Sequence, residues 1–246
     1  MTTKIDETTD KLRRLRLINM ADHLAEGLEK EKENNHGFLW LMDYLIETEN
    51  ESRWIRAIEN RHRNSRLIDK FLPSDFDFKF HLSRQKNRSI LLRLLECDFI
   101  EEHKDIIFIG HPGTGKTRLA KTIAHQACLK NKRVLFTTAI DMINHLIAAK
   151  ADHSLLKKLK YYQSPSLLLC DELGFLSLDE QSSSLFFQVL SARHGVVSTI
   201  VTTNLPFSRW GEIFQSTVIA QAIADRLVHN SEIILLEGPS YRQKSK

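Results

Sequence analysis

The spacing of apolar residues divides the chain into two parts. Up to about Phe71, apolar residues recur three or four positions apart, as at Leu41, Leu45 and Ile58, which is the spacing of one face of a helix. From Ile106 onward, short apolar runs alternate with longer segments of helical spacing. Apolar strands that alternate with helices form a parallel sheet covered on both faces. The pattern therefore predicts a small all-α N-terminal domain followed by an α/β domain.

The boundary between the two parts is expected near Leu72 and Pro73, because proline disfavours helix in the residue before it. Ahead of this boundary we expect a helix capped by Thr8 or Thr9, a break at Gly37 and a long second helix. The expected limits are a helical domain over residues 1–72, a linker over 73–82 and an α/β domain over 83–246.

Five apolar runs in the α/β part predict the strands of one sheet. The expected strands cover residues 106–109, 134–138, 167–170, 196–203 and 232–237. The expected helices cover residues 83–103, 116–130, 141–150, 155–162, 181–193 and 219–228.

Composition changes this picture little. Apolar residues make up 42% of the chain and charged residues 27%, which is ordinary for a globular protein. The net charge of +4 permits nucleic-acid binding without requiring it. No run approaches the ~18 apolar residues of a membrane span, and the polar N-terminus lacks the apolar segment of a secretory signal. Cys97, Cys128 and Cys170 each lie in an apolar run, as buried reduced thiols do. These features favour a cytoplasmic protein without membrane contact.

The segment GHPGTGKT, from Gly110 to Thr117, has the spacing of a phosphate-binding P-loop. It follows an apolar run and opens a helix, so its backbone N–H groups converge on phosphate oxygens at the positive end of that helix. Lys116 is expected to contact the β- and γ-phosphates of ATP and to act in catalysis, and Thr117 to ligate Mg²⁺. The expected nucleotide contacts are Gly110, His111, Pro112, Gly113, Thr114, Gly115, Lys116, Thr117 and Arg118.

Polar groups end two of the later apolar runs. Asp171 and Glu172 follow LLLC, on a strand that we expect to lie beside the P-loop strand. There, Asp171 would hold Mg²⁺ and Glu172 would orient and deprotonate an attacking water. Asn204 follows STIVTT and would hold the same water against the γ-phosphate. The alternative is that the acidic pair opens a solvated turn and that Asn204 serves the turn before Pro206.

These segments resemble the Walker A, Walker B and sensor 1 motifs of AAA+ ATPases. DELGFLSLDEQ, TTNLPFSRWGEIF, ADRLVHNSEII and GPSYR are similar, more specifically, to the IstB-type transposition ATPases and the related DnaC-type helicase loaders. The resemblance covers at least Phe76 to Arg242 and implies an AAA+ P-loop NTPase core. Because only a few residues follow Glu237, we expect no C-terminal lid domain, an absence that both branches share.

Without a lid, another part of the chain must close the nucleotide pocket. Phe76, Phe78 or the helix ending near Phe99 would pack beside the base. The alternative is that these rings form ordinary interdomain core.

The resemblance also assigns roles to two arginines. Arg226, in ADRL, matches the arginine that the family inserts into the neighbouring subunit's site, and such a finger is worth about 10³ to 10⁵ in rate. This implies a homo-oligomer, because the arginine acts in trans. Arg193 and Arg209 are weaker candidates for the same role, and a surface salt bridge is the alternative for Arg226. Arg242, in SYR, matches the sensor 2 arginine and would contact the nucleotide.

Basic residues cluster near the end of the helical part and again after the linker. Arginines of this kind suit DNA phosphates, and no base-reading motif accompanies them. We therefore expect largely sequence-independent binding that favours duplex DNA, with a solvated helix face as the alternative. Trp54, within the first cluster, is either core or a stacking platform. The expected DNA contacts are Arg53, Arg56, Arg61, Arg63, Arg66, Arg84, Lys86 and Arg88.

The resemblance implies an ATP-hydrolysing AAA+ protein that assembles on DNA and assists a transposase. A helicase loader acting in DNA replication is the nearest alternative, followed by a nucleotide-gated DNA-binding scaffold with little turnover. A P-loop kinase fits less well, because Asp171, Glu172 and Asn204 suit water as the nucleophile.

Overall fold

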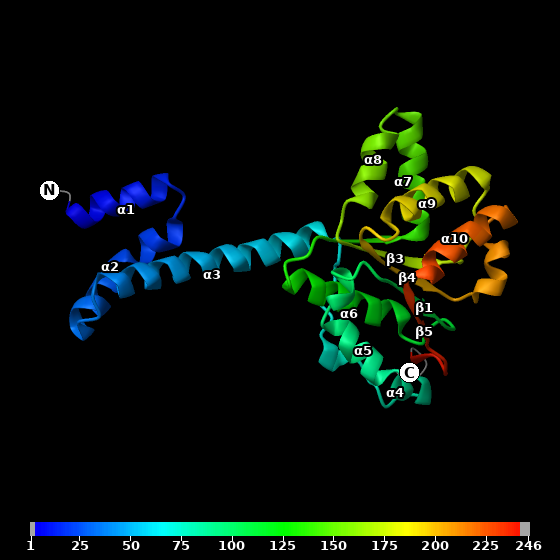
Figure 1. Ribbon diagram of the computed structural model, residues 1–246, viewed down its shortest axis with the longest axis horizontal. Helices are drawn as coiled ribbons and strands as arrows, with labels where there is room; N and C mark the ends of the chain where they lie inside the picture. The colour runs from blue at the N-terminus through cyan, green and yellow to red at the C-terminus, as the bar shows by residue number, and fades with distance from the viewer. Residues whose placement is uncertain (1–2, 242–246) are drawn as a thin grey trace. The chain divides into compact units, whose positions relative to one another are not determined.

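The computed structural model describes residues 3–241, which form two compact units divided between Asn60 and Arg61 (Figure 1). The division falls earlier than the expected boundary near Leu72. The reason is that the residues after Asn60 pack into the second unit: the carbonyl of Ser65 accepts the N–H of Phe136 at 2.7 Å, and Leu67 is buried in that unit's core. The limits of the domains stay a prediction.

The first unit contains α1 (Lys4–Arg14), α2 (Ile18–Asn34) and the beginning of α3 (Phe38–Asn64). Thr3 caps α1 in a capping box with Asp6, so the expected caps, Thr8 and Thr9, lie inside the helix. A small core holds the helices together and consists of Met20, Leu24, Leu41 and Leu45. Besides this core, side-chain hydrogen bonds such as those from the Asn19 and Met20 N–H groups to Glu49 connect α2 to α3.

The second unit is built on a parallel sheet of five strands in the order β2-β3-β4-β1-β5. Its strands are β1 (Asp105–Ile109), β2 (Val134–Thr138), β3 (Leu167–Leu173), β4 (Ser198–Thr203) and β5 (Ser231–Leu235). Its α-helices, besides the end of α3, are α4 (Leu82–Lys86), α5 (Arg88–Leu95), α6 (Lys116–Leu129), α7 (Ala139–Ala151), α8 (Leu155–Gln163), α9 (Glu180–Arg193) and α10 (Thr217–His229). Short 3-10 turns lie at Pro73–Asp75, Asp98–Ile100 and Phe207–Glu212.

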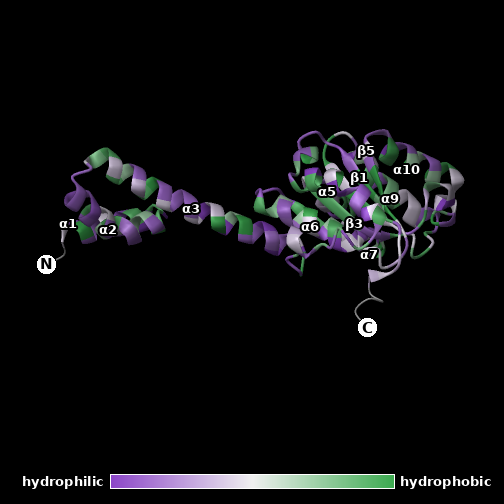
Figure 2. Ribbon diagram, turned by 90° about the horizontal axis from the view of Figure 1, so that it is seen from below, coloured by the Kyte–Doolittle hydropathy of each residue, from purple (hydrophilic) through white to green (hydrophobic). Residues whose placement is uncertain are grey.

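Helices cover both faces of this sheet. Successive residues of β1 point to opposite faces, so Ile106 and Phe108 join the core under α5 and α6, whereas Ile107 and Ile109 join the core under α7 to α10. Figure 2 shows the hydrophobic strands enclosed by helices of mixed polarity. The predicted parallel five-stranded sheet between helices is therefore confirmed.

Several predicted elements have different limits in the structure, and three of these differences have a clear cause or consequence. The expected helix over 83–103 is divided into α4, α5 and a 3-10 turn, with a break at Cys97, whose φ is 60°. β3 continues past the apolar run to include the acidic pair. β4 begins at Ser198 because the N–H groups of Val196 and Val197 both donate to the carbonyl of Arg193. Within residues 3–241, no helix is long and apolar enough to cross a membrane.

Candidate nucleotide-binding site

The sequence-predicted site residues converge at the carboxyl ends of three strands. The P-loop follows β1, the acidic pair ends β3 and Asn204 follows β4. The strand order corrects one expectation, because β4 lies between β3 and β1 and so separates the acidic pair from the P-loop strand. Any contact between the two motifs therefore has to pass over the end of β4.

Glycines set the shape of the P-loop. Gly113 and Gly115 have φ values of 83° and 97°, which favour glycine. At Gly110 the limit is space instead, because a Cβ there would meet the carbonyl oxygen of Leu236 at 2.0 Å. α6 begins directly after the loop at Lys116, so the positive end of its dipole faces the loop.

Lys116 lies against the loop that it follows. Its side chain is buried, and Nζ donates to the carbonyl oxygens of Gly110 at 2.7 Å and of His111 at 3.0 Å. The ammonium group therefore lies beside the backbone of the P-loop, where the phosphates of a nucleotide would bind.

Asp171 is held by hydroxyls from two other elements. Its Oδ1 accepts a hydrogen bond from Oγ1 of Thr117 at 2.9 Å and another from Oγ1 of Thr202, on β4. The carboxylate is 3% exposed. Thr117 therefore reaches the acidic pair directly across the end of β4, and Thr202 supports the same carboxylate oxygen from β4. Thr202 has no role that the sequence alone could indicate, because its place beside Asp171 depends on β4 lying next to β3.

Glu172 is exposed and has a left-handed backbone, with φ of 62°. The ladder between β3 and β4 shifts register between Cys170 and Leu173, and the N–H of Glu172 donates to Oγ1 of Thr202 at 3.0 Å instead of continuing the ladder. Such a conformation is strained for a residue other than glycine and is frequent at functional sites. Its effect is to turn the Glu172 side chain out of the sheet.

Asn204 lies at the same edge of the sheet and is partly buried. Its Oδ1 is fully enclosed yet accepts no hydrogen bond in the described part of the chain. Gly174 leaves room for it, since a Cβ at Gly174 would lie 3.3 Å from Oδ1. A buried, unsatisfied polar atom is costly in a structural turn, which favours the expected role of Asn204 as a ligand-binding group over a turn residue.

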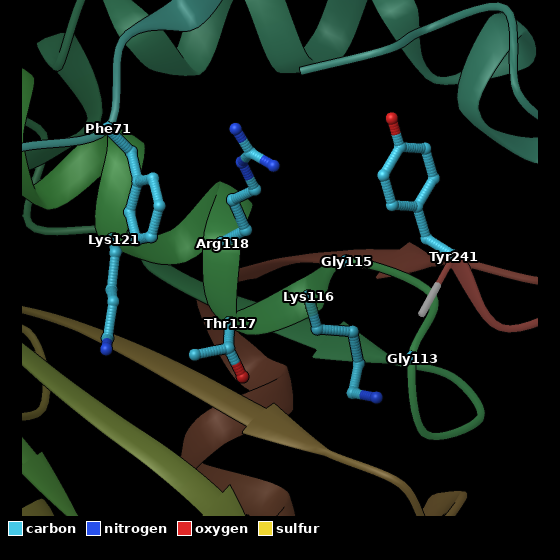
Figure 3. Close-up of a pocket in the computed structure, with 8 residues that line it drawn as sticks. All are labelled: Phe71, Gly113, Gly115, Lys116, Thr117, Arg118, Lys121 and Tyr241. Carbon is cyan, nitrogen blue, oxygen red and sulfur yellow. The ribbon is translucent and has the colours of Figure 1, made fainter. Parts of the chain in front are cut away.

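A cavity of about 290 Å³ opens beside the P-loop and is shown in Figure 3. The guanidinium of Arg118 lies 5.2 Å from the centre of the Phe71 ring, and the ring of Tyr241 lies across the pocket, on the other side of Arg118. Arg118 Nε is buried without a hydrogen-bond partner among residues 3–241. The lining residues are Phe71, Gly113, Gly115, Lys116, Thr117, Arg118, Lys121 and Tyr241.

The aromatic residues at this cavity differ from the expected ones. Phe76 and Phe99 are buried in the core under α5 and α6, and Phe78 packs at 5.0 Å from Phe76. These three phenylalanines therefore match the alternative that they are ordinary core residues, and they do not pack beside a nucleotide base. Phe71 and Tyr241 line the cavity instead, and the available signal was that each lies next to a feature already noted: the proline boundary and the SYR segment.

The arginine candidates for a finger differ in their surroundings. Arg226, on α10, is partly exposed; its guanidinium lies 4.5 Å from the ring of Phe187 on α9, the helix beside it in Figure 1. Arg193 is 1% exposed and donates to backbone carbonyls such as that of Tyr162, so it cannot reach another molecule. Arg209 is exposed and paired with Glu212 at 2.7 Å. Arg242 lies outside the described residues.

In the first unit, the two arginines expected to bind DNA are both exposed. Arg53 donates to Glu49 Oε1 at 2.7 Å and to the carbonyl oxygen of Arg16 at 3.1 Å, so part of its guanidinium is engaged within the unit. Arg56 is exposed on the same helix. Trp54 is half exposed, so its ring does not belong to the small core.

In the second unit, the expected DNA contacts divide into exposed and buried residues. Arg63, Arg66, Lys86 and Arg88 are exposed, and Arg61 is partly buried with a hydrogen bond to Asn131 Oδ1 at 3.1 Å. Arg84 contradicts the expectation, because it is 3% exposed and bonded behind the P-loop. A guanidinium enclosed in this way presents no surface to a DNA phosphate.

Solved structures define the class of this fold. DnaA from Aquifex aeolicus superimposes with a TM-score of 0.60 at 20% identity, over 73% of this chain and 54% of DnaA. A DnaC helicase loader superimposes with a TM-score of 0.54 at 24% identity, over 72% of this chain and 98% of the loader. Together with the P-loop geometry, these likenesses establish an AAA+ P-loop NTPase fold.

Residues 10–246 match the model of the family described as IstB-like ATP binding protein. The chain belongs to this family, and the expected resemblance is confirmed. It is 32% identical to a protein named as an ATP-binding protein of insertion sequence IS232 from Bacillus thuringiensis subsp. berliner, over 99% of this chain and 97% of the relative. It is 35% identical to the corresponding protein of IS5376 from Geobacillus stearothermophilus, over 95% of this chain and 92% of the relative.

Proposed function

We propose that this protein is an ATPase that assembles on DNA and assists the transposase of an insertion sequence. The observation that carries the proposal is the contact between Thr117 and Asp171, which joins the P-loop to the acidic pair at 2.9 Å. The family match and the insertion-sequence relatives support ATP as the nucleotide and transposition as the context.

The residues at this contact fit a magnesium ion. Mg²⁺ prefers hard oxygen ligands and binds through one or two carboxylates together with phosphate oxygens. The hydroxyl of Thr117 and the carboxylate of Asp171 supply such oxygens next to the P-loop. When bound, the ion would neutralise charge on the phosphates.

Hydrolysis requires a base and a water in line with the γ-phosphate. Glu172 supplies an exposed carboxylate turned out of the sheet, and it would take the proton of the attacking water. Asn204, whose Oδ1 is enclosed and without a partner among residues 3–241, would turn its amide toward the same water and orient it. Lys116 would leave the carbonyls of Gly110 and His111 to contact the β- and γ-phosphates.

The nucleotide base and ribose would occupy the cavity beside the loop. Phe71 and Tyr241 offer ring faces there, and Arg118 carries an Nε that has no hydrogen-bond partner within residues 3–241. Arg242 would add a contact from the end of the chain. These residues would hold the base and ribose beside the P-loop.

Arg226 would complete the site of a neighbouring subunit. Its partial exposure on α10 leaves the guanidinium accessible to a second copy of the chain. ATP binding would favour the assembly. In the assembled protein, DNA phosphates would be contacted by six arginines and one lysine: Arg53, Arg56, Arg61, Arg63, Arg66, Arg88 and Lys86. Binding of this kind is largely independent of sequence and weakens with salt.

The first test is ATP turnover by the purified protein alone, with duplex DNA and with single-stranded DNA, at two salt concentrations. Stimulation by duplex that fades with salt is the expected result. Stimulation by single strands only would replace the proposal with a helicase loader. ATP-dependent assembly on DNA without phosphate release, even with a transposase present, would replace it with a nucleotide-gated scaffold. Lys116→Ala is the control and is expected to abolish ATP binding.

A further inference from the structure

Arg84 is a buried cation directly behind the phosphate-binding loop. It is 3% exposed, and its two terminal nitrogens form a fork. Nη2 donates to the carbonyl of Thr114, inside the P-loop, at 2.7 Å, and Nη1 donates to the carbonyl of Asp77, in the segment before α4, at 2.9 Å. Both acceptors are backbone oxygens rather than carboxylates. Burying a guanidinium in this way is costly, so its retention requires a compensating interaction or a function.

Three aromatic rings surround this guanidinium. Its central carbon lies 4.6 Å from the ring centre of Phe76, 4.7 Å from that of Phe80 and 5.2 Å from that of Tyr241. Cation–π attraction of this kind strengthens when the cation is desolvated. The rings therefore stabilise the charged form of Arg84 in place of water. Burial lowers the pKa of Arg84, and the carboxylate of Asp77 offsets part of that effect; an arginine nevertheless stays protonated.

Only a loop that contains glycine allows this approach. A Cβ on Gly115 would lie 2.9 Å from Arg84 Nη2 and 3.2 Å from the Phe76 ring. Gly115 also lines the cavity on its other side. The backbone of the loop is thus the layer that separates the Arg84 charge from the nucleotide pocket.

Two segments that are far apart in the sequence meet at Arg84. The aromatic segment from Phe76 to Phe80 supplies two of the rings. Tyr241 supplies the third; its N–H donates to the carbonyl of Gly113 at 2.9 Å, and its ring packs 4.8 Å from that of Phe80. Because both segments contact the same guanidinium, a movement of either segment would shift Arg84 and, through its hydrogen bond to Thr114, the P-loop.

We propose that Arg84 is a positioning residue for ATP: its fork holds the Thr114 carbonyl away from the phosphates, and its charge favours nucleotides with more phosphate groups. This inference rests on the proposed nucleotide site. The loop N–H groups then face the pocket, and the fixed positive charge behind them adds to Lys116 and to the α6 dipole. Arg84 touches no phosphate itself.

The test compares the dissociation constants of ATP, ADP and adenosine for the full chain and for Arg84→Met and Arg84→Lys, by displacement of a fluorescent ATP analogue. Arg84→Met is expected to weaken ATP binding about tenfold, because it removes a buried positive charge close to the phosphates, to weaken ADP less and to leave adenosine unchanged. Arg84→Lys keeps the charge but loses the fork, so its loss for ATP should be intermediate. Arg93→Met, which removes an exposed arginine of α5 that has no role in the proposed sites, is the matched control and should bind like the unaltered protein.

Two results would overturn the inference. One is unchanged ATP affinity in Arg84→Met, or in Arg84→Lys if the methionine variant does not fold. The other is an equal loss for ATP, ADP and adenosine, which would mean that Arg84 only supports the fold. Failure of the unaltered chain to bind ATP would instead contradict the proposed function, so the two failures are distinguishable.

Discussion

At the scale of single residues, the hydroxyl of Thr202 forms one hydrogen bond to each member of the acidic pair. Its hydroxyl donates to Asp171 and accepts from the N–H of Glu172. One side chain thereby fixes the group that would hold Mg²⁺ and the backbone of the group that would act as base. The chemistry of Asp171 and Glu172 was predictable from their place after an apolar run. The role of Thr202 was not, because it depends on which strand becomes the neighbour of β3.

Replacing Thr202 by valine keeps the shape of the side chain and removes both hydrogen bonds. Loss of a residue that supports a metal ligand typically lowers metal affinity or activity about 10- to 100-fold. We therefore expect the ATP turnover of Thr202→Val to be about 10- to 100-fold lower than that of the unaltered protein. Turnover should be measured at saturating Mg²⁺ and ATP. Thr137→Val, at a buried threonine of β2, should hydrolyse ATP normally, and normal turnover in Thr202→Val would contradict the role given to Thr202.

Glu172→Gln should separate binding from chemistry. The amide cannot take a proton from water, and loss of a general base costs about 10² to 10⁴ in rate. We expect ATP affinity to stay near that of the unaltered protein while phosphate release almost ceases. Binding and phosphate release measured on the same preparation test this. Rapid hydrolysis by the variant would show that another group is the base.

Phe71→Ala tests the wall of the cavity. Because the ring lies beside Arg118 at the rim of the pocket, its removal should raise the dissociation constant for ATP about tenfold through lost stacking and burial. The affinity for inorganic triphosphate, which has no base, should change little. An equal loss for both ligands would place Phe71 in the support of the loop rather than at the base.

At the scale of elements, α2 has a cap that lies on another helix. Leu17, at the start of α2, provides no side-chain cap. Instead, the Glu49 carboxylate from α3 accepts from the N–H groups of Asn19, at 2.8 Å, and Met20, at 3.2 Å, and pairs with Arg53. Burial acts to raise the pKa of Glu49, but the hydrogen bonds from Arg53 and these amides lower it below the usual value. A local sequence window cannot show such a cap, because the acceptor lies 30 residues away from the donor.

A group with a lowered pKa stabilises the fold above its unfolded pKa, and this contribution is lost as the pH falls through the folded value. We therefore expect Glu49→Gln to destabilise the packing of α2 by about 1–3 kcal/mol at pH 7. The difference from the unaltered protein should shrink as the pH falls below the usual range of a glutamate. Hydrogen exchange of the α2 amides in the full chain measures this. Glu47→Gln, at an exposed position on the same helix, should change nothing, and unaltered exchange in Glu49→Gln would refute the remote cap.

At the scale of the whole molecule, the proposal requires a second copy of the chain. The P-loop, the acidic pair and Asn204 converge on one edge of the sheet, but Arg226 lies on α10 and packs against α9. The buried state of Arg193 and the ion pair of Arg209 leave Arg226 as the arginine best suited to act in trans. Subunits that lack different parts of the site should therefore complement each other.

Arg226→Ala and Glu172→Gln should each hydrolyse ATP poorly when alone. Mixed, they should recover part of the lost turnover, because an Arg226→Ala subunit keeps its base and can receive the arginine of a Glu172→Gln neighbour. Titration of one variant with the other, monitored by phosphate release, measures this recovery. Arg209→Ala should retain normal turnover alone. If Arg226→Ala hydrolyses normally, the finger is assigned to the wrong residue.

The sequence by itself determined the order of strands and helices, the P-loop and the identity of the acidic pair, because these depend on spacing between neighbouring residues. Only the tertiary structure decided that β4 separates the strand of Asp171 from the P-loop strand and that Thr202 supports Asp171 from β4. It also decided that Phe71 and Tyr241, rather than Phe76, line the cavity, and that Arg84 is buried while Arg63 and Arg88 remain exposed. The physical reason is that burial and strand adjacency depend on packing between segments far apart in the chain, so residues of one type in similar local sequence come to play different roles.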